Sequence, residues 1–121
     1  MSKFVLRKTA SGVKFDLQAT NGQVILSSEV YKTHSAAVKG IVSIQKSAAD
    51  APVEDQTGED RAEMPNPKFE MYRDKAGQYR FRLKARNGRI VGVSEAYSSR
   101  TGCMGGMESV KINAGQAEIE G

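Results

Sequence analysis

The sequence contains few of the residues on which most enzymes depend. Its 121 residues include one histidine, one cysteine and no tryptophan. A single cysteine cannot form an internal disulfide, and a His/Cys metal cluster needs several ligands of these two types. His34 would have to act alone in any histidine-dependent mechanism, and no helix-based carboxylate pair or Ser/His/Asp arrangement emerges. We therefore predict that the chain is not an enzyme and that it holds no metal ion and no cofactor.

Long apolar runs are absent as well. No stretch approaches the ~20 apolar residues of a membrane span. The first residues, MSKFVLRK, alternate in polarity and do not form an export signal. We expect no membrane association and a cytoplasmic location, with which the single cysteine is consistent. The 18 Lys and Arg exceed the 14 Asp and Glu, and the resulting net charge of +4 permits acidic partners without identifying one.

The sequence does contain an internal duplication of one unit. A shift of 66 positions aligns FDLQATNGQVILSSEVY (15–31) with FRLKARNGRIVGVSEAY (81–97). Between residues 15–54 and 81–120, 13 of 40 positions are identical. The duplication predicts a first repeat at 1–54, an acidic, proline-containing linker at 55–67 and a second repeat at 68–121. We expect the two repeats to form one compact domain, because a unit of about 50 residues is near the lower limit for folding alone.

Each repeat predicts three antiparallel strands, a helix and a short final strand. The second strand alternates in polarity and ends at Asn-Gly, which favours a two-residue type I′ hairpin turn. That turn would place Ala85 opposite Ile90 and Leu83 opposite Gly92. The final strands, at 51–54 and 117–120, have no obvious partner within their own repeat. If the two repeats pack together, these strands can reach across to the neighbouring sheet.

The predicted helices begin after Thr33 and Ser99, whose hydroxyls suit the N-cap position. One apolar stripe on each helix faces the core, and it consists of Ala37, Val38, Ile41 and Ile44 or of Cys103, Met104, Met107 and Val110. The stripe predicts that Cys103 is a buried, inert thiol. A glycine recurs beside the stripe, at Gly40 and Gly106, and this indicates that another backbone comes close to each helix.

The paired segments 15–31 and 81–97, with S-E-x-Y and G-[IM]-x-S-[VI] in both copies, resemble the YegP-like proteins. These are small bacterial proteins of unknown function that occur as single or tandem units. The resemblance implies an α+β fold, a tandem duplication of a β-β-β-α-β unit. The antiparallel meanders would pack with the helices about a pseudo-twofold axis. The resemblance supplies no catalytic residues. We expect a monomer with an internal pseudo-dimer.

A stripe of cations on the second repeat is the first candidate binding surface, and its members are Arg80, Arg82, Lys84, Arg86 and Arg89. The hairpin register sets Arg80 opposite Glu95, and the same face of the first repeat carries Asp16 and Gln18. Because that face is not basic in both repeats, a solvated strand face is the favoured interpretation. Contact with an anion or a nucleic acid is the alternative.

A second candidate lies at the start of the second helix. Ser99, Arg100 and Thr101 combine hydroxyls and a cation at a helix N-terminus, where a small anion can bind. Helix capping explains the same residues without a ligand. The sequence as a whole favours a non-enzymatic binding or interaction module for protein or nucleic acid, and the basic face of the second repeat is a candidate contact surface for either partner. The alternative is a small-ligand or anion-binding protein, or an enzyme, with its site between the repeats.

Overall fold

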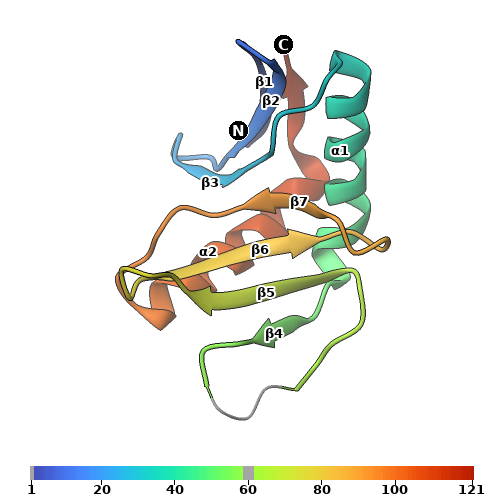
Figure 1. Cartoon of the computed structure of the whole chain (residues 1–121). Helices are drawn as coiled ribbons and strands as arrows, with labels where there is room; N and C mark the ends of the chain where they lie inside the picture. The colour runs from blue at the N-terminus through green and yellow to red at the C-terminus, as the bar shows by residue number, and fades with distance from the viewer. Residues whose placement is uncertain (1, 59–61) are drawn as a thin grey trace.

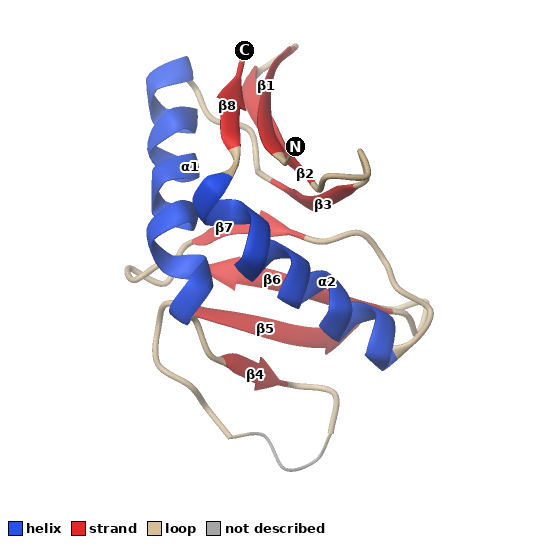
Figure 2. Cartoon of the chain, turned by 180° about the vertical axis from the view of Figure 1, so that it is seen from behind, coloured by secondary structure: helices blue, strands red, loops and turns tan. Residues whose placement is uncertain are grey.

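The eight strands in the described part of the chain belong to one twisted sheet, and both helices lie on the same face of it (Figures 1 and 2). The computed structural model describes residues 2–58 and 62–121. The strands run in the order β4-β5-β6-β7-β3-β2-β1-β8. Their bounds are β1 Lys3–Thr9, β2 Gly12–Gln18, β3 Val24–Ser27, β4 Val53–Asp55, β5 Lys68–Arg73, β6 Tyr79–Lys84, β7 Ile90–Val93 and β8 Glu118–Glu120. The helices are α1 His34–Ser47 and α2 Arg100–Asn113, each followed by one 3₁₀ turn, at Ala48–Asp50 and Ala114–Gln116.

The two repeats exchange their last strands. β4, from the first repeat, pairs in parallel with β5 of the second, and β8 pairs in parallel with β1 of the first. The registers are equivalent, since Val53 lies beside Phe69 and Ile119 beside Phe4. The predicted α+β duplication is therefore confirmed, and each repeat completes the edge of the other.

The repeats also meet at the centre of the sheet, where β3 adjoins β7 through the pair Ser27 and Val93. Leu26 and Gly92 occupy equivalent positions in the two repeats and face each other at this seam. A Cβ atom on Gly92 would lie 2.6 Å from the Leu26 side chain. Two leucines could not fit here. The first repeat therefore has a leucine at this position, and the second repeat has a glycine.

The predicted type I′ turns are wrong, although the register beyond them is right. All described non-glycine residues have negative φ, so the asparagine of each turn is not in the left-handed region that type I′ requires. Instead, Gly22 donates to the carbonyl of Ala19 and Ala19 donates to that of Gln23, which makes a three-residue loop. The Asn21 side chain accepts the N–H of Gln23 and stabilises this alternative.

A bulge then corrects the register. In the second repeat Lys84 pairs with Ile90 and Leu83 with Gly92, so Val91 is the extra residue. The prediction that Ala85 faces Ile90 is therefore off by one residue, whereas the pairing of Leu83 with Gly92 is confirmed. The glycine of each turn has a φ of 84°, which only glycine adopts freely.

The recurring helix glycines accommodate a tyrosine and not a backbone, which corrects our interpretation. A Cβ atom on Gly40 would lie 2.4 Å from the Tyr31 hydroxyl oxygen, and one on Gly106 would lie 2.2 Å from that of Tyr97. Each tyrosine stacks on the phenylalanine of its own second strand, with the Tyr31 and Phe15 ring centroids 6.0 Å apart. The tyrosine of S-E-x-Y and the glycine of G-[IM]-x-S-[VI] are therefore two halves of one packing contact.

The helices otherwise follow the predicted pattern. Thr33 accepts the N–H of Ala36, and Ser99 accepts that of Gly102 in the same way. Cys103 is fully buried, as predicted, and burial raises the pKa of its thiol to about 11. Met104 does not belong to the buried stripe, because it is 42% exposed. The buried faces instead include the two glycines under the tyrosines.

We expected residues 55–67 to be a linker that need not pack, and this is wrong for its ends. Asp55 belongs to β4, and the Gln56 N–H donates to the carbonyl of Met71. Near the other end of the linker, the Met64 N–H donates to the carboxylate of Glu54. Residues 59–61 of the predicted linker lie outside the described residues.

Candidate functional site

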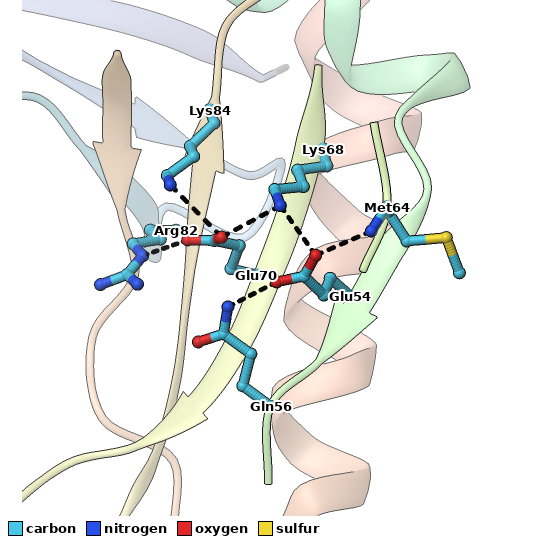
Figure 3. A network of polar contacts seen from close by, with 7 residues as sticks. All are labelled: Glu54, Gln56, Met64, Lys68, Glu70, Arg82 and Lys84. Carbon is cyan, nitrogen blue, oxygen red and sulfur yellow. Dashed lines mark hydrogen bonds and ion pairs between the residues drawn. The ribbon is translucent and has the colours of Figure 1, made fainter. Parts of the chain in front are cut away.

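Carboxylates neutralise much of the predicted cation stripe. Arg82 Nε lies 2.6 Å from a Glu70 carboxylate oxygen, and Lys84 Nζ lies 3.4 Å from the other one (Figure 3). Arg80 Nε lies 3.0 Å from the carboxylate of Asp74. The sequence missed these pairs because the acidic partners come from β5 and from the turn after it. Pairing with Glu95 across the hairpin, which we had expected for Arg80, is not among the described ion pairs.

Glu70 also belongs to a buried ionic network beside β4 (Figure 3). Lys68 Nζ lies 2.7 Å from a Glu54 oxygen and 3.3 Å from a Glu70 oxygen, and all three side chains are at most 8% exposed. Hydrogen bonds from Lys68, Gln56 and the Met64 N–H lower the pKa of Glu54 from its ordinary 4.5 to about 2. The network therefore attaches the linker to the second repeat and is structural.

The equivalent pair in the first repeat is a natural control for this network. Lys3 and Glu120 are also in contact, at 2.9 Å, but their side chains are 40% and 58% exposed. An exposed pair contributes little to stability, because water already solvates both charges.

The Glu54 network predicts how stability depends on pH. The folded-state pKa lies below the ordinary value, so the carboxylate stabilises the fold above pH 4.5, and that contribution is lost as the pH falls toward 2. We expect the melting temperature of the Glu54→Gln variant to fall less steeply between pH 4.5 and 2 than that of the unmodified chain. Glu120→Gln should leave the pH dependence almost unchanged. Equal slopes for the Glu54→Gln variant and the unmodified chain, measured by circular dichroism, would contradict the assignment.

The second candidate site is also partly occupied by internal contacts. Ser99 caps α2, and the Arg100 guanidinium forms an ion pair with the carboxylate of Asp55 in β4. Thr101 is exposed in the first turn of the helix. An anion at these three residues stays a prediction, although Arg100 already has an acidic partner from the other repeat.

Two hollows lie elsewhere, between α1 and the second repeat. One of about 600 Å³ separates α1 from residues 65–67 and Arg86. A second, of about 620 Å³, separates the same helix from the β6–β7 turn (residues 85–89) and the start of β7. Lys39 and Ser43 line both hollows, so the two lie side by side along α1. Figure 1 shows the β6–β7 turn reaching across to α1.

This groove is strongly basic. Its cations come from both walls and are Lys32, Lys39, Lys46, Arg86 and Arg89. All five are exposed, and none forms an ion pair with another of the described residues. Two carboxylates also line it, Asp50 in the first hollow and Glu29 in the second. We call this surface the basic groove.

The duplication shows that the fold does not require these cations. The equivalent surface lies between α2 and the β2–β3 turn, and every one of the five cations is replaced there by an uncharged residue. The replacements, in the same order, are Ser98, Gly105, Ile112, Thr20 and Gln23. Packing requirements should be shared by the two copies, as they are for the tyrosine and glycine pair. The charge is therefore a property of one groove only.

The structure thus divides the predicted contact residues. Arg86 and Arg89 lie in the basic groove, whereas Arg80, Arg82, Lys84 and Arg100 are paired with carboxylates. The sequence prediction missed the three lysines. Their seven-residue spacing, together with their absence from the second repeat, was the available signal.

The comparisons with known proteins agree with the duplication. A model described as a domain of unknown function, DUF1508, matches residues 9–55 and again 74–120. The chain belongs to the DUF1508 family. The predicted resemblance to YegP-like proteins is thereby confirmed, because the UPF0339 protein YegP of Yersinia pestis is 34% identical over 93% of this chain and 88% of its own.

Other DUF1508 relatives differ in length. A UPF0339 protein of Methanosarcina acetivorans is 58% identical over 52 residues, which cover 43% of this chain and 90% of that protein. It therefore has the length of about one repeat. Among solved structures, a protein of unknown function, yegP from E. coli, superimposes with a TM-score of 0.81 at 28% identity, over 98% of this chain and 90% of that one.

Within residues 2–58 and 62–121, no group of three His, Cys, Asp or Glu side chains could hold a metal ion. In the same ranges, no helix has the length and apolar character needed to cross a bilayer.

Proposed function

We propose that this chain is a non-enzymatic binding module whose basic groove holds a polyanionic partner. The observation that carries the proposal is the charge asymmetry between the two copies. Five cations that form no ion pair within residues 2–58 and 62–121 converge on one groove, and none stands at the equivalent positions of the other. Positive side chains that line a hollow raise the local concentration of anions. They also repel one another when no anion occupies the hollow. A partner that supplies negative charge removes that repulsion.

The side chains of the groove favour binding over catalysis. Its polar side chains are cations, hydroxyls such as Ser43, the amides of Asn66 and Asn87, and two carboxylates that lie in separate hollows. One chain supplies both walls, so a monomer is sufficient. A cytoplasmic location is part of the proposal, since the single cysteine is buried and cannot form an internal disulfide.

A small anionic ligand is the second candidate. Each hollow alone has the volume of a typical small-molecule site. The groove also lies between the two repeats, where the sequence led us to expect such a site. A metabolite that stays bound in native mass spectrometry of the purified chain would favour this candidate over the polyanion.

Chromatography on immobilised heparin, a polyanion, tests the proposed function. We expect Lys39→Glu combined with Lys46→Glu to elute at clearly lower salt than the unmodified chain, because both side chains line the groove. The matched control is Lys8→Glu combined with Lys75→Glu, which changes the net charge equally at exposed positions outside the groove. Equal elution of the two double variants would show that net charge, and not the groove, governs retention.

A further inference from the structure

We infer that the partner of the basic groove is a single-stranded nucleic acid whose phosphates follow α1, an inference that rests on the proposed function. Lys39 and Lys46 are seven residues apart on one helix, nearly two full turns, so they project on the same side. Lys32 continues the row just before the N-cap, Thr33. The row spans about 20 Å at the helical rise of 1.5 Å per residue. This length suits a short stretch of chain, near the lower end of the ~4–16 nucleotides that single-strand sites cover.

The walls of the groove favour the binding of single-stranded nucleic acid over that of a duplex. A protein that reads a duplex inserts a protruding helix or ribbon into the major groove, and the cations then stand on the convex side of that element. Here the lysines of α1 share their hollows with Arg86 and Arg89 on the opposite wall. The charge therefore faces into a concave space between two elements. A single sugar-phosphate backbone can enter such a space and meet cations from both sides.

The same lining indicates that the bases are not read. Tyr31 is the aromatic residue of the lining, and its ring is stacked on Phe15 while its hydroxyl lies against Gly40. It offers no free platform of the kind on which proteins stack successive bases. Binding should therefore depend on phosphates, tolerate any sequence and weaken steeply as salt is added.

Fluorescence anisotropy with a labelled twelve-nucleotide oligothymidine, titrated with the full chain at several salt concentrations, tests this inference. For a single strand, each phosphate contact contributes about −0.7 to the slope of log affinity against log salt concentration. Five cations, with one contact each, therefore predict a slope near −3.5. Lys39→Gln combined with Arg89→Gln should weaken binding at low salt at least tenfold and reduce the slope by about 1.4. Lys8→Gln combined with Lys75→Gln, the charge-matched control, should leave both quantities close to those of the unmodified chain.

Three results would overturn the inference in distinguishable ways. Equal or tighter binding to a duplex of the same length would exclude the single strand as the preferred partner. Binding to heparin or polyglutamate without binding to the oligonucleotide would leave the proposed function standing and remove the nucleic acid. If the chain binds no polyanion even at low salt, the inference and the proposed function both fail.

Discussion

The isolated second repeat, residues 66–121, is expected to sediment as a weak dimer or to remain unfolded. Within the whole chain, β5 pairs with β4 of the first repeat, and β8 pairs with β1 of the first repeat. The fragment therefore lacks the strands that pair with β5 and with β8. Helix α1, which packs on β7 in the intact chain, is missing as well.

A dimer of the fragment can restore only part of these contacts. β8 of one copy can take the place of β4 beside β5 of the other, because Ile119 and Val53 occupy equivalent positions. The central seam cannot be restored in the same way. Leu26 of the first repeat fills the space above Gly92, and a dimer of the second repeat would bring two glycines together there. The void this leaves should make the dimer weak.

Sedimentation velocity over a range of concentrations, with circular dichroism in parallel, measures this outcome. The relative in Methanosarcina acetivorans, which has the length of about one repeat, is the natural comparison. A second-repeat fragment that stays a folded, cooperatively unfolding monomer at high micromolar concentration would contradict the strand exchange.

Gly106→Leu is expected to lower the free energy of unfolding by about 3 kcal/mol, the upper part of the range for overpacked cores. Even a Cβ atom at this position would lie 2.2 Å from the Tyr97 hydroxyl oxygen and 3.0 Å from a Phe81 ring carbon. The tyrosine cannot simply rotate away, since its ring is stacked on Phe81 with the centroids 6.2 Å apart. The substitution must therefore displace both rings.

The preceding residue is a matched control. Gly105 lies on the same helix and is exposed, and a Cβ atom there would meet nothing within 4 Å. Gly105→Leu should leave the stability unchanged or raise it by up to ~1 kcal/mol, because leucine is the better helix former. Urea denaturation compares the two variants. Equal losses of unfolding free energy at the two positions would mean that leucine destabilises this helix wherever it is placed. The tyrosine contact would then not be the cause.

The repeat made much of the fold predictable. Hydrophobic alternation and a common offset located every strand and helix, and the unpartnered final strands pointed to the exchange. The turn type was not predictable from Asn-Gly alone, because that pair also suits a three-residue loop in which only Gly22 needs a positive φ. The glycines on the helices correctly indicated a close approach. A sequence pattern does not say what approaches, and here it is a tyrosine from the same repeat.

The candidate site was predictable only in part, because charge pairing depends on contacts between strands. Arg82 and Arg86 both belong to the alternating stripe in the sequence. In the folded chain, one lies beside Glu70 and the other lines the basic groove. The other wall of that groove comes from α1, about 40 residues earlier in the chain and in the other repeat. Only the relative placement of the two repeats brings these cations together.

Amide chemical shifts, recorded by NMR while the full chain is titrated with the oligothymidine, test most directly whether the basic groove is the binding site. The pseudo-twofold provides an internal control, since each of the five groove cations has an uncharged counterpart on the other copy. We predict that shifts concentrate at Lys32, Lys39, Lys46, Arg86 and Arg89, and that the counterparts Ser98, Gly105, Ile112, Thr20 and Gln23 stay unchanged. Shifts of equal size in both copies, or shifts centred on Arg80 and Arg82 of the outer sheet face, would contradict the assignment.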